Sequence, residues 1–229
     1  IHQHIAPALH KRNEHLSNFW MENQEQLWKN KVTDQPHLDI LIINNEDDFA
    51  FMIAHTCRGL GYKADVVDTF EVEPHLLKNK LVIIGHGPGN PNDTKHPRMK
   101  KLHALAKYIL ENKLPCLGIC LGHQILAINI GLKVERQISS TQGMQRNVTI
   151  SDTSHRLGFY NSFSPVMEAH VQHPTELKIN TDEQNRIIYM QSPHFEGFQF
   201  HPESVMSETG INLIQEALSH IENYAARYQ

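Results

Sequence analysis

A single cysteine, Cys120, is flanked by glycines in the tract GICLG at the end of the apolar segment LPCLGI. This spacing is typical of a nucleophile elbow, where glycines avoid Cβ clashes in a tight strand-to-helix turn. The amino end of the next helix would favour a thiolate, and the Leu121 N–H would be the natural donor to an oxyanion. The tract alone also fits a small buried residue, which is what we expect of Cys57 and Cys116.

A histidine and a carboxylate follow another apolar segment, in the tract FEGFQFHPES. A thiolate that attacks an acyl group needs a base to take and return a proton, and that base needs an orienting carboxylate. We expect His201 to be the base and Glu203 to orient it, with Pro202 fixing the backbone so that both project to one side. The order Cys, His, Glu differs from that of α/β-hydrolases and papain-like proteases.

The loop GHGPGNP follows a third apolar segment, LVII, and supplies a third candidate element. Gly87 and Gly89 leave backbone N–H groups uncovered, which suits a second oxyanion donor at Gly87 or the binding of polar substrate atoms. A phosphate-binding loop is the competing interpretation. The loop lacks the G-K-[ST] of a Walker motif and does not fit G-x-G-x-x-G.

The elements that must position these residues alternate between strands and helices. Short apolar segments predict buried strands, and the intervening amphipathic segments predict helices. This alternation predicts an α/β fold with an open, mainly parallel, flavodoxin-like sheet, helices on both faces and added β-ribbons after Leu132. Ligands of such sheets bind beyond the carboxyl ends of the strands. The predicted strands are 38–44, 62–68, 81–85 and 114–119, with a later strand through FEGFQF (195–200), and the predicted helices are 47–61, 98–112, 121–131 and 209–226.

Composition limits the partners of this 229-residue chain. The net charge of −4 gives no basic field for nucleic acid, and the apolar segments are far shorter than the roughly 20 residues of a membrane span. Seventeen histidines are scattered without metal-ligand spacing, so we expect no metal. The start at Ile1 and the lack of a signal peptide suggest a fragment or processed cytoplasmic chain. We expect residues 1–36 to be a linker or docking arm and residues 37–229 to be the catalytic domain.

The motifs GPGNP, GICLGHQ and FHPES, taken together and in this order, resemble the class I, triad-type glutamine amidotransferases. The resemblance covers residues 38–225. It implies that Cys120 attacks the side-chain amide of glutamine, that His201 protonates the leaving ammonia, and that a glutamyl thioester is then hydrolysed. By matching position it also implies the residues that hold glutamine: Gly87, Gly89, Leu121, Gln124, Gln142, and the backbone at Ser162 and Phe163.

The resemblance further implies a partner that consumes the ammonia. The tracts LGFYNSF and NNEDDFAFMIAH and the lead segment HKRNEHLSNFW are similar to the amidotransferase half of the phenazine-pathway synthases that aminate chorismate, the 2-amino-2-desoxyisochorismate synthases. There the half follows a chorismate-binding domain. We therefore expect a chorismate-binding synthase subunit or domain, a dimeric full-length parent, no cofactor in this chain and Mg²⁺ only in the synthase.

Two positions distinguish this chain within the family it resembles. The amidotransferase components of anthranilate and aminodeoxychorismate synthases, the alternative assignment, usually carry His-Ser where this chain has Asn161-Ser162. The family commonly has proline where this chain has His86, which leaves the two glycines of the loop in place but changes its local charge.

Two other functions use the same features. A cysteine peptidase or γ-glutamyl hydrolase would use the same elbow but turn over peptides or polyglutamates without a partner. A binding module would use residues 1–36 to dock a partner and keep the site as a vestige, although all three triad positions are filled.

Overall fold

The computed structural model describes residues 38–168 and 176–228. The docking arm expected at residues 1–36 lies outside this part of the chain, so the expected domain division stays a prediction. None of the helices described is long and apolar enough to cross a membrane.

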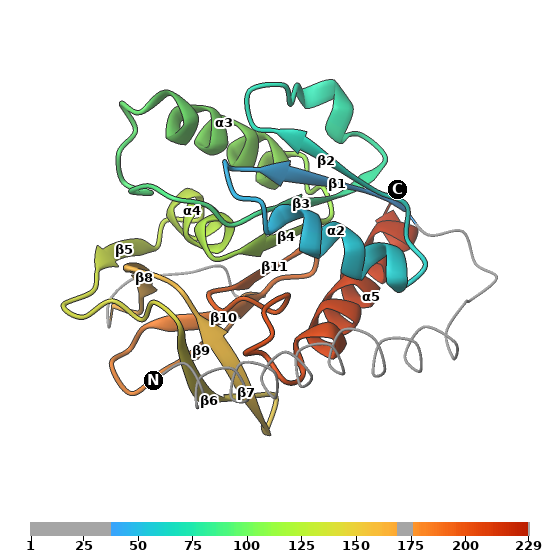
Figure 1. Cartoon of the computed structure of the whole chain (residues 1–229). Coiled ribbons are helices and arrows are strands. Elements are labelled where there is room, and N and C mark those ends of the chain that lie inside the picture. The colour runs from blue at the N-terminus through green and yellow to red at the C-terminus, as the bar shows by residue number, and fades with distance from the viewer. Residues whose placement is uncertain (1–37, 169–175, 229) are drawn as a thin grey trace, which may run out of the picture.

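A seven-stranded sheet forms the middle layer, in the order β2-β1-β3-β4-β11-β10-β9 (Figure 1). The first five strands in this order are parallel, β10 runs antiparallel to β11, and the edge strand β9 runs antiparallel to β10. The parallel part has the flavodoxin-like order, so the predicted open, mainly parallel sheet is confirmed. The strands are β1 (Asp39–Asn44), β2 (Ala64–Asp68), β3 (Lys80–Ile84), β4 (Cys116–Ile119), β9 (Lys178–Thr181), β10 (Ile187–Gln191) and β11 (Phe195–Phe198).

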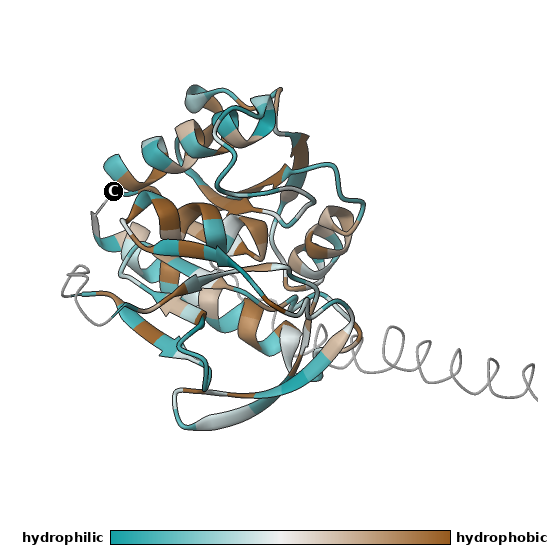
Figure 2. Cartoon of the chain, turned by 90° about the vertical axis from the view of Figure 1, so that its left-hand side faces the viewer, coloured by the Kyte–Doolittle hydropathy of each residue, from teal (hydrophilic) through white to brown (hydrophobic). Residues whose placement is uncertain are grey.

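Helices cover both faces of this sheet. The helices α2 (Ala50–Gly59) and α5 (Gly210–Tyr228) pack on one face, and α3 (Pro97–Glu111) and α4 (Leu121–Asn129) pack on the other (Figure 1). Successive side chains of a strand point to opposite faces, and accordingly Ile40 and Ile42 join one core while Leu41 and Ile43 join the other. Hydrophobic residues therefore concentrate between the layers (Figure 2).

The remaining elements lie outside the large sheet. The 3₁₀ turn η1 (Pro74–Leu77) precedes β3. Two antiparallel pairs form the expected ribbons: β5 (Lys133–Arg136) pairs with β8 (Phe163–Val166), and β6 (Met144–Ile150) pairs with β7 (Thr153–Phe159). The sequence did not predict β7 or β8, because β7 begins with polar residues and β8 contains a proline.

The strand expected to run through FEGFQF is shorter than predicted. It ends at Phe198, which pairs with Ile119, the last residue of β4. Parallel pairing with β4 stops there; the Gln199 N–H still donates to the Ile188 carbonyl of β10 at 3.0 Å, and regular strand structure ends before His201 is reached. The elements that carry the cysteine and the histidine thus end at the same carboxyl edge of the sheet.

Candidate active site

Cys120 occupies the turn between β4 and α4. Its φ of 50° and ψ of −98° lie in a region that a residue with a Cβ rarely adopts, and such strain is typical of a nucleophile elbow. The Cys120 N–H donates to the Phe198 carbonyl at 2.7 Å, which ties the elbow to β11. The side chain is 7% exposed.

The glycine that follows the elbow is needed for close packing. A Cβ on Gly122 would lie 2.0 Å from the carbonyl oxygen of Ile84 at the end of β3, a distance that no side chain can occupy. The first turn of α4 therefore packs directly against the backbone of the neighbouring strand.

We expect Gly122→Ala to lower the free energy of unfolding by about 2 kcal/mol or more, because the clash is with backbone that must move with β3. Urea unfolding monitored by circular dichroism measures this change. Gly131→Ala is the comparison without a steric clash: a Cβ there meets no atom within 4 Å, so its cost is that of an alanine at a φ of +91° alone. An unchanged stability of Gly122→Ala would contradict the packing described.

His201 and Glu203 form a hydrogen-bonded pair beside the cysteine. The Nδ1 of His201 lies 2.7 Å from the Glu203 Oε1, and both residues are buried. The His201 N–H donates to the Gly158 carbonyl at 2.9 Å, and the Ser207 hydroxyl donates to the His201 carbonyl at 2.6 Å. The backbone of the histidine is thus fixed from both sides.

The electrostatics of this pair favour a charged histidine. Burial opposes charge on His201, but the Glu203 carboxylate and the Cys120 sulfur outweigh burial and hold the pKa of His201 well above its usual value. Burial also raises the pKa of Glu203, but His201 and His86 outweigh it and lower that pKa below its usual value. The Nε2 of His201 is buried without an ordinary hydrogen bond to any described residue. Such contacts often tighten only when a substrate is bound.

Buried polar groups hold the glycine loop after β3. A Cβ on Gly87 would lie 2.3 Å from the carbonyl oxygen of Asn45, so the two segments touch backbone to backbone. The Asn45 amide donates to the Gly85 carbonyl at 2.7 Å, and the Arg98 guanidinium donates to the Pro88 carbonyl at 2.7 Å. The loop is therefore fixed by residues next to β1 and in α3 that the sequence motifs did not identify.

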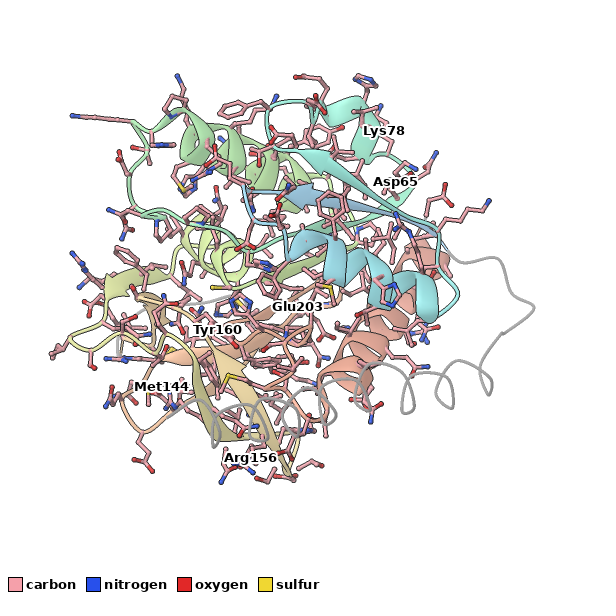
Figure 3. All side chains as sticks on the ribbon, viewed as in Figure 1. Asp65, Lys78, Met144, Arg156, Tyr160 and Glu203 are labelled. Atoms are coloured by element: carbon pink, nitrogen blue, oxygen red, sulfur yellow. The ribbon has the colours of Figure 1, made fainter. Side chains whose placement is uncertain are left out.

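The predicted site residues meet in one cavity of about 580 Å³. All three candidate catalytic residues line it, and Figure 3 labels Glu203 toward the middle of the molecule, near Tyr160. Leu121 does not line the cavity, and its side chain is buried in the core; its expected role uses only the backbone N–H. The predicted substrate residues on the wall are Gly87, Gly89, Gln124, Gln142, Ser162 and Phe163.

The amide of Gln124 is already bonded within the protein. Its Nε2 donates to the Phe163 carbonyl at 2.7 Å and to the Gln199 Oε1 at 3.1 Å. The Gln199 amide nitrogen in turn lies 3.7 Å from the Cys120 sulfur. Sequence reasoning missed Gln199, although it is a polar residue at the end of an apolar strand, two residues before His201.

One group of described residues has ligand atoms close enough to hold a metal ion. These are His86, His201 and Glu203, whose ligand atoms lie within 4.8 Å of one another. Two ligands of a tetrahedral zinc ion, each bound at about 2.0–2.1 Å, are roughly 3.3 Å apart. The 2.7 Å between His201 and Glu203 is shorter and matches a shared proton. We therefore interpret His201 and Glu203 as a hydrogen-bonded pair, with the His86 Nδ1 3.5 Å from the same Glu203 oxygen.

The three cysteines are expected to differ in reactivity. Cys57 and Cys116 are fully buried in the two cores; burial raises the pKa of Cys57 to about 12 and that of Cys116 further still. Cys120 lines the cavity beside His201, whose pKa is held well above its usual value by Glu203 and the Cys120 sulfur. We expect iodoacetamide at neutral pH to label Cys120 alone, as read by peptide mass spectrometry. Equal labelling of all three in the native protein would contradict the site.

The fold and the site together define a class of protein. Its members have an open α/β sheet that presents a thiol at a strand-to-helix elbow beside a histidine–carboxylate pair. The model of the family "Glutamine amidotransferase class-I" matches residues 41–221. The chain belongs to this family and is a glutamine amidotransferase.

Two of the named relatives are an anthranilate synthase and an anthranilate synthase component. The chain is 32% identical over 223 residues, 96% of its length, to a protein of Pseudomonas fluorescens named "Anthranilate synthase, phenazine specific", of which it spans 35%. It is 28% identical over 81% of its length to "Anthranilate synthase component 2" of Helicobacter pylori, of which it covers 98%. The crystal structure of a glutamine amidotransferase from Thermotoga maritima shares the fold, with a TM-score of 0.62, 21% identity, and coverage of 84% of this chain and 98% of that one.

Proposed function

We propose that the chain hydrolyses glutamine through Cys120, His201 and Glu203, and delivers the ammonia to a synthase that aminates chorismate. The observation that carries the first part is the 2.7 Å His201–Glu203 contact in the cavity that also holds the elbow cysteine. The second part is supported by the likeness to the phenazine-specific anthranilate synthase along 96% of this chain.

The proposed reaction has two halves. The Cys120 sulfur attacks the side-chain amide carbon of glutamine, and the resulting oxyanion is held by the N–H groups of Leu121 and Gly87. His201 gives its proton to the nitrogen, the C–N bond breaks, and ammonia leaves a γ-glutamyl thioester on Cys120. Water then attacks the thioester with His201 as base, and glutamate leaves as the thiol is restored. Glu203 stabilises the charged form of His201 in both halves.

The other wall of the cavity is proposed to select free glutamine. The backbone at Ser162 and Phe163 lies beside the elbow, and the Gln124 amide holds the Phe163 carbonyl at 2.7 Å. Gly89 and Gln142 also line the cavity. In this arrangement Gln124 shapes the substrate-binding segment, and its direct contact with glutamine stays a prediction.

The proposed acceptor enzyme is 2-amino-2-desoxyisochorismate synthase, with any Mg²⁺ bound by the synthase and not by this chain. The alternatives are anthranilate synthase and aminodeoxychorismate synthase. Each acceptor predicts a different product from the same two substrates, so the product identifies the partner.

The test supplies this chain and the synthase with chorismate and with glutamine that carries a heavy-nitrogen label in its side-chain amide. We expect mass spectrometry to find the label in 2-amino-2-desoxyisochorismate. Label in anthranilate or aminodeoxychorismate would contradict the proposed acceptor. Hydrolysis of peptides or polyglutamates without any partner, at a rate above that for glutamine, would contradict the amidotransferase role.

A further inference from the structure

His86 is a buried imidazole beside the triad that the reaction proposed above does not use. It is 1% exposed and lies in the loop after β3, directly before Gly87. Its Nδ1 lies 3.5 Å from the Glu203 Oε1, and its Nε2 lies 3.4 Å from the Asp47 Oδ1. The His86 ring thus lies between two carboxylates, that of Asp47 in the loop after β1 and that of Glu203 in the segment after β11.

Both ring nitrogens of His86 are buried and make no ordinary hydrogen bond within the described part of the chain, so the Asp47 and Glu203 oxygens at 3.4 and 3.5 Å are the polar contacts recorded for them. Burying an imidazole costs free energy unless its N–H groups face acceptors. The two carboxylates therefore explain why a histidine, and not an apolar residue, occupies this buried position. The ring also packs on His201, with centroids 4.7 Å apart, while Tyr160 packs on His201 at 5.0 Å.

We propose that His86 is a positioning residue of the triad, which holds the same Glu203 oxygen that accepts from His201 and links it to Asp47. The contacts then form one series from Asp47 through His86, Glu203 and His201 to Cys120. Because Gly87 follows His86 directly, the same anchoring keeps the proposed oxyanion donor in place relative to the triad. This inference rests on the proposed function of the triad.

The charges that face His86 predict the direction in which it should shift the pKa of His201. The groups around it are the Asp47 and Glu203 carboxylates, the His201 ring and, beyond that ring, the Cys120 sulfur. A charged His86 repels a charged His201, and a neutral His86 that donates to Glu203 competes for the oxygen that His201 uses. In either form we expect His86 to lower the pKa of His201, so its removal should raise that pKa.

Variants at position 86 separate positioning from space filling. His86→Leu keeps bulk but removes both polar contacts, whereas His86→Gln keeps an N–H donor for Glu203. We expect kcat/KM for glutamine, measured with the synthase present, to fall about tenfold in His86→Leu, mainly through kcat, and to stay within about threefold in His86→Gln. The alkaline limb of kcat/KM should move to higher pH in His86→Leu. His155→Leu, on β7 outside the cavity, is the matched control and should keep the wild-type value.

A second measurement tests the role of His86 without relying on glutamine turnover. Titration of the His201 imidazole by NMR, assigned with His201→Gln, should show a higher pKa in His86→Leu than in the wild type. If the wild type releases no glutamate, the proposed function fails while this titration still tests His86. An unchanged titration and rate in His86→Leu, or an equal loss in the Leu and Gln variants confined to KM, would overturn the proposal. If His86→Leu does not fold, His86→Met carries the same comparison.

Discussion

Replacement of Cys120 by alanine is expected to lower glutamate release by at least about 10⁴-fold, to the level of the uncatalysed reaction under the assay conditions. The reason is that no other described side chain on the cavity wall offers a thiol at the strand-to-helix elbow. The assay follows glutamate formed from glutamine in the presence of the synthase, with thermal unfolding used to show that the variant is folded.

The matched control for this substitution is Cys57→Ala, which removes a thiol from the buried face of α2 without touching the cavity. It should keep wild-type turnover with a small loss of stability, because only one sulfur atom leaves a buried site. Glutamate release that survives Cys120→Ala, or that is lost equally in both variants, would contradict the assignment of the nucleophile.

Replacement of Glu203 by glutamine is expected to lower kcat/KM by about 10³–10⁴-fold, the scale of losing a carboxylate that orients a catalytic histidine. The Glu203 charge helps to hold the pKa of His201 above its usual value. The proton that His201 gives to ammonia is present below that pKa and is lost as the pH rises through it. Without the charge the pKa falls, so the alkaline limb of kcat/KM should move to lower pH.

This shift has the opposite sign to the one expected for His86→Leu, so the two variants check each other. Glu208→Gln is the matched control, because Glu208 is an exposed carboxylate that contacts Arg156 at 3.3 Å and lies outside the cavity. Glu208→Gln should leave both the rate and the pH profile unchanged. A Glu203→Gln variant with a normal rate, or with an alkaline limb moved to higher pH, would contradict the role given to Glu203.

The sequence predicted the parallel part of the fold because its signals are local. Five apolar segments and the amphipathic segments between them sufficed, since strands buried on both faces must be apolar and their helices must be amphipathic. The edge ribbons were predicted less well. β7 begins with exposed residues and β8 holds Pro165, so neither carries the alternation by which a strand is identified.

The site was predictable where short motifs carry the chemistry. The elbow around Cys120, the His201–Glu203 pair and the Gly87 loop all face one cavity, as their positions at strand ends required. Their supports were not predictable, because they depend on contacts between distant parts of the chain. Arg98 reaches the glycine loop from α3, and Gln199 reaches Gln124 across 75 residues. His86 stood out as a departure from the family, but its place between two carboxylates required the fold.

The central claim is that a γ-glutamyl group is carried on Cys120, and its most direct test is to trap that intermediate. The chain and its synthase are mixed with isotopically labelled glutamine, quenched in acid during turnover, digested and analysed by mass spectrometry. The account predicts one γ-glutamyl group on the peptide that contains Cys120, absent from His201→Gln quenched at the same time. A labelled group on any other residue, or glutamate formed at full rate with no adduct on Cys120 at any quench time, would contradict it.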